Sequence, residues 1–215
     1  MNYDNSNMEL SNSRIEEALQ VYGCGPITGL AGRIQTYIDL LLKWNRKISL
    51  TTVTDPEEIV KFHFGESLFA LSQLKFEKSR LADVGAGAGF PGLPLAMAVP
   101  ELEVTLIESN IKKCAFLAEV IRQLRLTNVT VFQGRMESFS PGDPAFSYVC
   151  ARALGQFDEL LAWAALHLDR AGRLLLWLGE SDSKALAGRS DWNWGAPQLI
   201  PGSSRRQLLI GSRKA

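Results

Sequence analysis

Residues 81–92 read L-A-D-V-G-A-G-A-G-F-P-G, in which four glycines follow a short apolar run. Glycine loses more conformational freedom on folding than other residues, so this cluster indicates a backbone that takes positive φ or lies directly against a ligand. The apolar run predicts a strand over 81–84, and the apolar segment after the glycines predicts a helix over 92–99. The stretch is therefore typical of a strand, a tight loop and a helix at the start of an α/β sheet.

Beyond this loop, short apolar runs alternate with longer amphipathic segments. The strands and helices predicted there are 103–108, 110–126, 129–132, 146–150, 157–168 and 173–178. Strands separated by helices imply right-handed crossovers and a mostly parallel sheet that is covered on both faces. Apolar segments at 198–200 and 207–210 flank Pro-Gly-Ser-Ser and predict a hairpin at an antiparallel C-terminal edge. The predicted fold class is α/β, with a Rossmann-like, doubly wound sheet.

The first 79 residues have apolar side chains at helical spacing instead. Within them, Thr54-Asp55-Pro56-Glu57-Glu58 predicts a helix start, with a capping side chain, a first-turn proline and acids near the positive end of the helix dipole. We therefore expect a helical N-terminal region over 1–79 that packs on a ligand-binding core over 80–215.

The composition limits the possible partners and the compartment. Lys plus Arg and Asp plus Glu both number 23, so any polyanion would have to bind to a local basic patch. The three cysteines are scattered, which argues against a disulfide framework or a Cys-x-x-Cys metal site and is typical of a reducing compartment. The polar N-terminus has no apolar signal core, and no apolar run is as long as a membrane span. We expect a cytoplasmic, metal-free protein that acts as a monomer.

The glycine loop and two carboxylates predict the ligand. In this fold class ligands bind beyond the carboxyl ends of the strands, where Asp83 and Glu108 are expected. A carboxylate in the position of Glu108 can accept hydrogen bonds from both ribose hydroxyls of a nucleoside. The G-x-G-x-G spacing differs from the dinucleotide fingerprint, because Phe90 replaces its third glycine and Pro91 removes an amide donor.

An acid before the loop suits a ligand with an ammonium group better than a diphosphate. S-adenosylmethionine has both the ribose and the ammonium, so we expect it as the cofactor. The contacts predicted from this reasoning are Asp83, Gly85, Gly87, Gly89 and Glu108. A purely structural turn is the alternative interpretation of the glycines.

Several segments resemble one family. L-A-D-V-G-A-G-A-G-F-P-G-L-P-L-A (81–96) and L-I-E-S-N-I-K-K-C-A-F-L (106–117) resemble the ribosomal RNA small-subunit methyltransferase G family, also called glucose-inhibited division protein B. Further similar segments are W-N-R-K-I-S-L-T (44–51), P-E-E-I-V-K-F-H-F-G-E-S-L (56–68) and A-R-A (151–153). The resemblance therefore covers nearly the whole chain.

The resemblance implies a class I, S-adenosylmethionine-dependent enzyme that methylates N7 of one guanine in small-subunit (16S) ribosomal RNA. It also implies that the cofactor contacts are Gly85, Phe90, Met136, Glu137 and Arg152. One departure is that the family usually has Lys-Gly at the end of the fifth strand, where this chain has Leu178-Gly179. If that lysine touches RNA, the contact is missing here or comes from another residue.

Methylation at N7 requires little catalytic machinery. Guanine N7 has an in-plane lone pair and no proton, so orientation and desolvation can replace a general base. Arg152 is the predicted catalytic residue, in an orienting role toward the guanine, the cofactor carboxylate or a phosphate. A simple surface ion pair is the alternative for Arg152. His63 and His167 are expected to be structural, and the cysteines to lie in the core.

A basic and aromatic cluster is the candidate RNA-binding surface. It consists of Lys43, Trp44, Arg46 and Lys47. Such residues stack on bases and neutralise phosphates, but cations also favour a helix C-terminus for reasons unrelated to RNA. Two other functions stay open at this point: a methyltransferase of a small molecule or a protein, and a nucleotide- or NAD-binding oxidoreductase.

Overall fold

The computed structural model describes residues 10–76, 78–140, 146–152 and 155–214. Within these residues, eight strands form one sheet in the order β3-β2-β1-β4-β5-β8-β6, with β7 paired to β8. The strands are β1 (Arg80–Val84), β2 (Glu103–Glu108), β3 (Val129–Gln133), β4 (Phe146–Arg152), β5 (Leu168–Gly179), β6 (Trp192–Trp194), β7 (Gln198–Leu199) and β8 (Arg206–Arg213).

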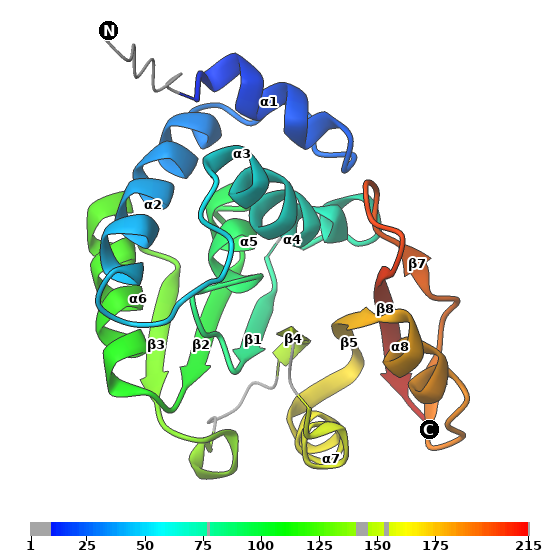
Figure 1. Ribbon diagram of the computed structural model, residues 1–215. Coiled ribbons are helices and arrows are strands. Elements are labelled where there is room, and N and C mark those ends of the chain that lie inside the picture. Colours follow the sequence, from blue (N-terminus) through cyan, green and yellow to red (C-terminus); the bar gives the residue numbers. More distant parts are fainter. Residues whose placement is uncertain (1–9, 77, 141–145, 153–154, 215) are drawn as a thin grey trace, which may run out of the picture.

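The sheet has the predicted direction pattern. Strands β1 to β5 pair in parallel, and β6, β7 and β8 pair antiparallel. The chain order reverses between β1 and β4, which lie side by side at the centre of the sheet (Figure 1). In open α/β sheets, ligands bind outside the carboxyl ends of the strands at such a switch point. The prediction of a doubly wound α/β sheet with an antiparallel C-terminal edge is confirmed.

Helices cover both faces of the sheet (Figure 1). They are α1 (Asn12–Gln20), α2 (Leu30–Asn45), α3 (Pro56–Ile59), the π-helix η1 (Val60–Gly65), α4 (Glu66–Leu68), η2 (Phe69–Ser72), α5 (Gly92–Ala98), α6 (Ile111–Leu124), η3 (Met136–Ser138), α7 (Phe157–His167) and α8 (Glu180–Ala187). Asp55 caps α3 as expected, since its Oδ1 accepts the Glu58 N–H at 2.9 Å.

The N-terminal helices share a hydrophobic core with one face of the sheet. Buried side chains such as Ile34, Tyr37 and Phe64 belong to the same apolar cluster as Leu93 of α5 and Phe116 of α6. The opposite face, covered by α7 and α8, has a separate cluster. This packing agrees with a helical region that lies on the core, and the domain division between residues 79 and 80 stays a prediction.

Three details of the C-terminal half differ from the sequence-based expectation. Strand β5 begins at Leu168, earlier than the predicted 173, and α8 and β6 were not expected. Helix α8 is mostly polar and β6 has only three residues, so neither has enough periodic apolar side chains to be recognised. The predicted hairpin is present as β7 and β8.

Asp83 connects the end of β1 to the start of α5. Its side chain is fully buried, and its Oδ2 accepts the Gly92 N–H at 2.8 Å. Burial raises the pKa of this carboxyl from 3.8 to about 7, although the bond from Gly92 opposes the shift. Asp83 is therefore a titrating group inside the core.

This predicts a pH-dependent stability. Because the folded pKa of Asp83 is raised, its contribution to stability is complete below pH 4 and is lost as the pH rises to about 7. The substitution Asp83→Asn removes the titration. The unfolding free energy of the variant, minus that of the unmodified protein, should therefore rise by about 2.6 kcal/mol from pH 5 to pH 8. Urea unfolding of both proteins at both pH values measures this, and an identical difference at the two values would contradict the buried titration.

Candidate functional site

The loop between β1 and α5 uses glycine at each position with positive φ. The φ angles of Gly85, Gly87 and Gly89 are 71°, 57° and 86°. A Cβ at Gly89 would lie 2.4 Å from a Leu93 methyl carbon, whereas one at Gly87 would meet nothing closer than the Gly85 carbonyl oxygen at 3.7 Å. Gly89 is thus required by packing as well as by conformation, and Gly87 by conformation, with open space beside it.

Glu108 holds this loop from the end of β2. Its Oε2 accepts the Gly87 N–H at 2.9 Å, and its Oε1 accepts the Asn110 N–H at 2.7 Å. The residue is 7% exposed. A carboxylate has about four acceptor positions, so Glu108 can accept further bonds from a ligand while it holds the loop.

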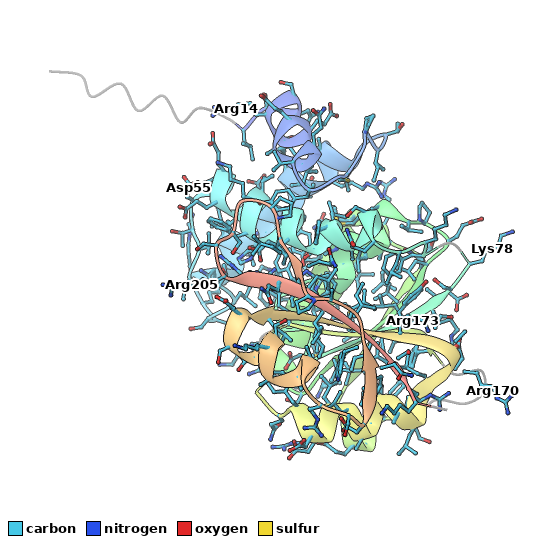
Figure 2. The ribbon with its side chains drawn as sticks, turned by 90° about the vertical axis from the view of Figure 1, so that its right-hand side faces the viewer. Arg14, Asp55, Lys78, Arg170, Arg173 and Arg205 are labelled. Carbon is cyan, nitrogen blue, oxygen red and sulfur yellow. The ribbon has the colours of Figure 1, made fainter. Side chains whose placement is uncertain are left out.

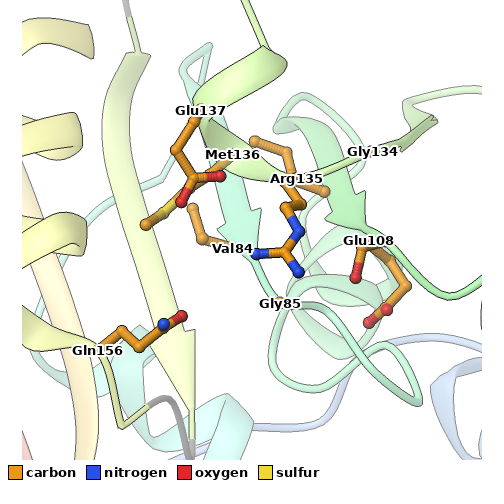
Figure 3. A pocket seen from close by; sticks show the side chains of 10 residues that line it. Val84, Gly85, Glu108, Gly134, Arg135, Met136, Glu137 and Gln156 are labelled. Carbon is orange, nitrogen blue, oxygen red and sulfur yellow. The ribbon is translucent and has the colours of Figure 1, made fainter.

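A cavity of about 310 Å³ opens at the carboxyl ends of β1, β2 and β3. Figure 3 shows the side chains of Glu108 and Arg135 pointing toward Gly85, with Met136 and Gln156 on the other side. The lining residues are Val84, Gly85, Ile107, Glu108, Ser109, Gly134, Arg135, Met136, Glu137 and Gln156. The cavity thus combines apolar walls with a carboxylate and an open stretch of backbone, as a nucleoside requires.

Some of the predicted contacts line this cavity and others do not. Those that do are Gly85, Glu108, Met136 and Glu137. Asp83 is not among the lining residues: its fully buried carboxylate caps α5 from inside the core, and its contact with the ammonium group of a ligand stays a prediction. Sequence reasoning also missed Ser109, Gly134, Arg135 and Gln156. The sequence offers one sign that these residues belong to the site: each follows the carboxyl end of a strand, and Glu108 is the last residue of β2.

Phe90 faces the N-terminal helices. Its ring is 8% exposed and lies between Tyr37 of α2, at 5.3 Å between centroids, and His63 of η1, at 4.8 Å. Phe64 meets the same ring edge-on at 5.2 Å. The side chain that replaces the third glycine of a dinucleotide fingerprint therefore anchors the loop in an aromatic cluster, outside the lining of the cavity.

Arg152 ends β4 and forms a buried ion pair. Its Nη2 donates to Glu66 Oε2 at 2.8 Å and to the Phe62 carbonyl at 2.7 Å. Glu66 is 1% exposed and also accepts from Arg206 Nε at 3.0 Å. Burial lowers the pKa of Arg152 and raises that of Glu66, and the charges of the partners oppose both shifts. Two guanidinium groups thus share one carboxylate, and Arg152 Nη1 is buried without a partner among the described residues.

The histidines and cysteines have structural surroundings. His63 Nε2 lies 2.7 Å from Thr51 Oγ1, and burial, with a smaller effect of Arg152, lowers the pKa of His63 to about 4. His167 stacks on Trp163 and donates from Nδ1 to its carbonyl at 2.7 Å. All three cysteines are buried. A neutral His63 with this pKa is a weak base at physiological pH.

The candidate RNA-binding residues lie at the C-terminal end of α2. Lys43, Arg46 and Lys47 are exposed, whereas Trp44 is partly buried and meets Phe116 edge-on at 5.9 Å. Asn45 fixes the loop beyond them, since its Oδ1 accepts the N–H groups of residues 50 and 51 at 2.8 and 3.0 Å. This geometry is compatible with RNA binding and with a favourable helix C-terminus, so the RNA contact stays a prediction.

The described residues contain neither a cluster of metal-binding side chains nor a membrane-spanning helix. In the described ranges, His, Cys, Asp and Glu side chains do not gather in groups of three that could hold a metal ion. No helix in the part of the chain that the structure describes combines the length and apolarity needed to cross a bilayer. Ala153, part of the A-R-A motif, lies outside the described residues.

Comparison with known proteins decides the family. The family model described as rRNA small subunit methyltransferase G matches residues 31–193. The chain belongs to this family. Among its relatives, the ribosomal RNA small subunit methyltransferase G of Myxococcus xanthus is 37% identical over 213 residues, covering 96% of this chain and 92% of that protein. The proteins of the same name from Pseudomonas putida and Desulfitobacterium hafniense are 37% and 39% identical over 83% and 79% of this chain. The match spans 84% of the Pseudomonas protein and 64% of the Desulfitobacterium protein.

Solved structures share the fold. The glycopeptide N-methyltransferase MtfA complexed with S-adenosyl-L-methionine superposes with a TM-score of 0.59 at 16% identity, covering 71% of this chain and 88% of that one. A predicted O-methyltransferase from Agrobacterium tumefaciens gives a TM-score of 0.56 at 22% identity, covering 70% and 79%. The family member described here thus has the class I methyltransferase fold.

The open space beside Gly87 makes this residue a test of the loop. In Gly87→Ala, the positive φ becomes unfavourable by about 1–2 kcal/mol, and the loop and its bond to Glu108 should shift. Affinity for S-adenosylhomocysteine should fall at least tenfold, about 1.4 kcal/mol, while the protein stays folded. Calorimetric titration measures this. Gly32→Ala is the control, because Gly32 lies within α2 and an added Cβ meets nothing within 4 Å. Unchanged affinity in a folded Gly87→Ala protein would make the loop purely structural.

Proposed function

We propose that this protein transfers a methyl group from S-adenosylmethionine to N7 of one guanine in 16S ribosomal RNA. The observation that carries the proposal is the cavity that Gly85 and Glu108 line at the carboxyl ends of the parallel strands. The chain that holds this cavity belongs to the methyltransferase G family. The family model makes an oxidoreductase, or a methyltransferase of a small molecule or a protein, the weaker interpretation of the same cavity.

The residues around the cavity fit this cofactor. When bound, S-adenosylmethionine supplies a methyl group that is activated by a sulfonium. Glu108 has free acceptor positions for the ribose hydroxyls, and Val84, Ile107 and Met136 offer apolar walls to an adenine ring. Gly85 has no side chain, so the backbone at the end of β1 stays open to the cavity. The remaining predicted contacts, Gly87, Gly89 and Phe90, support the site by shaping the loop.

The guanine that accepts the methyl group has to be oriented, whereas proton transfer is not required. Guanine N7 offers a lone pair and no proton, so the reaction requires no general base. The low pKa of His63 is therefore compatible with it. Arg152 ends β4 beside the switch point, and its guanidinium is fixed by Glu66 and by the carbonyl of Phe62. A fixed guanidinium of this kind can orient the guanine or an adjacent phosphate.

Arg206 is the candidate to replace the cation that the family usually has at the end of the fifth strand. Leu178 is buried in the sheet, and the residue paired with Gly179 across the strands is Arg206. Its guanidinium lies on Glu66 and 5.0 Å from the centroid of the Phe62 ring. Figure 2 shows the turn before β8, which carries Arg205, reaching toward the N-terminal helices.

The proposal also includes RNA contacts by Lys43, Trp44, Arg46 and Lys47, a cytoplasmic location and a monomeric state.

The ribose contact can be tested through Glu108. The substitution Glu108→Gln removes the charge that would accept the hydroxyl hydrogen bonds, and it turns an amide N–H₂ toward the N–H of Gly87 or Asn110, so that the ribose contact and the support of the loop weaken together. A hydrogen bond to a charged group is worth about 1.5–3 kcal/mol. S-adenosylmethionine and S-adenosylhomocysteine should weaken by the same factor, because their ribose is identical. Calorimetric titration of both ligands checks this, and a loss confined to one of them would place Glu108 elsewhere.

The reaction can be tested on ribosomal RNA and on small-subunit particles from cells that lack the gene. The purified protein should methylate them and leave duplex DNA nearly unmodified. N7 methylation leaves a fixed positive charge on the guanine, so the product should be cleaved by borohydride followed by aniline at a single position. Methylation of an exocyclic nitrogen, or equal activity on free guanosine, would contradict the assigned substrate and leave the cofactor assignment standing.

Arg152→Ala should lower the turnover number more than tenfold and RNA affinity less than threefold, because the guanidinium orients a group at the reaction centre. Arg170→Ala is the control. Arg170 lies at the opposite edge of the molecule from Arg205 (Figure 2), whose neighbour Arg206 shares Glu66 with Arg152. Single-turnover rates and RNA binding are measured for both variants. Equal losses of rate and RNA affinity in Arg152→Ala would make this residue an RNA-binding or structural group.

A further inference from the structure

The glycine loop is held by a second side chain, which comes from the N-terminal helices. Tyr37 of α2 is fully buried, and its hydroxyl donates to the Ala88 carbonyl at 2.5 Å. Glu108 binds the neighbouring residue, Gly87, from the other side of the loop. Two adjacent residues of the cofactor loop are therefore held by two separate elements, β2 and α2.

From this geometry we infer that Tyr37 is a positioning residue for the cofactor: its hydroxyl fixes the backbone of residues 87–89 in the conformation that binds the nucleoside. The inference rests on the proposed S-adenosylmethionine-dependent function. It gives the helical N-terminal region a role in cofactor affinity, in addition to any contact with RNA.

The loop needs external support because its own conformation is weakly determined. Three of its five residues from 85 to 89 are glycines with positive φ, and glycine populates many other conformations at little cost. The loop has an internal hydrogen bond from the Gly89 N–H to the Ala86 carbonyl at 2.6 Å. The N–H groups of Gly85 and Ala86 also bind the Ile107 carbonyl, at 2.9 and 3.1 Å. The bond to Glu108 and the bond from Tyr37 hold the two residues that follow, Gly87 and Ala88.

Tyr37 is rigid enough to provide this support. Its ring stacks on Phe90 with an interplanar angle of 11° and meets Phe64 edge-on at 5.2 Å. Phe116 adds a third aromatic contact at 6.2 Å. Burial raises the pKa of the Tyr37 hydroxyl well above its usual value, so the hydroxyl remains a donor at any physiological pH.

The loop sequence is matched to this hydroxyl. A Cβ at Gly89 would lie 2.5 Å from Tyr37 Oη, so no larger residue fits there without displacing the tyrosine. The next residue, Phe90, supplies the ring on which Tyr37 stacks. Gly89 therefore leaves the space that the Tyr37 hydroxyl occupies, Phe90 packs against the Tyr37 ring, and Ala88 accepts the hydrogen bond.

The chain offers a matched control for the loss of such a hydroxyl. Tyr148 of β4 donates to the Lys75 carbonyl at 2.6 Å, which also connects the sheet to the N-terminal region. This bond lies away from the glycine loop and from the cavity lining. Tyr37→Phe and Tyr148→Phe thus each remove one hydroxyl that binds a backbone carbonyl, and only the first removes a contact to the loop.

The test is to titrate both variants with S-adenosylhomocysteine well below their melting temperatures and to measure their unfolding in urea. Both variants should stay folded with reduced stability. Tyr37→Phe should weaken S-adenosylhomocysteine about tenfold and raise the KM for S-adenosylmethionine similarly, with kcat and the KM for RNA within twofold. Tyr148→Phe should bind the ligand within twofold of the unmodified protein. Unchanged affinity in Tyr37→Phe, or equal losses in both variants, would overturn the inference.

A ligand-free readout separates this inference from the proposed function. Hydrogen exchange of the amides of residues 85–90 should be faster in Tyr37→Phe than in Tyr148→Phe. If the unmodified protein binds no S-adenosylhomocysteine, the proposed cofactor is wrong and hydrogen exchange decides the role of Tyr37 alone. Equal protection of these amides in the two variants would then overturn it.

Discussion

The hydrogen bond from the Gly87 N–H to Glu108 is the interaction on which the site depends. It joins the loop after β1 to the end of β2, so the two edges of the cavity are set by one carboxylate. The same carboxylate is the group that would receive the ribose. Loop conformation and ligand recognition are therefore coupled in this molecule, because a change at Glu108 affects both.

Around this bond, the N-terminal helices act as part of the site. Tyr37 and His63 enclose the ring of Phe90, and Thr51 in turn lies 2.7 Å from His63. On the acceptor side, Glu66 from the same region holds Arg152. Both halves of the site thus use residues that precede the sheet in the sequence.

Sequence reasoning predicted the strands other than β6, the antiparallel edge and the end of the sheet at which the cavity lies, because hydrophobic periodicity and the glycine pattern are local signals. Gly85 and Glu108, two of the residues predicted to bind the cofactor, line the cavity, since the end of a strand determines where its residue lies. Sequence reasoning could not foresee that Asp83 caps α5, because whether a carboxylate at a strand end faces the cavity or the next helix depends on the packing of α5. It could not pair Arg152 with Glu66, since these residues are far apart in the sequence and meet only through the tertiary fold.

The position of β8 has a consequence for synthesis of the chain. This strand is synthesised after β5, β6 and β7, yet it lies inside the sheet between β5 and β6. Until it emerges, the long strand β5 presents an unpaired edge of apolar residues, which is a template for association with other chains. Glu66 also lacks Arg206 during that interval. A nascent chain can therefore complete the cofactor cavity before β8 is made, but the sheet and the ion pairs of Glu66 are completed only once β8 has emerged.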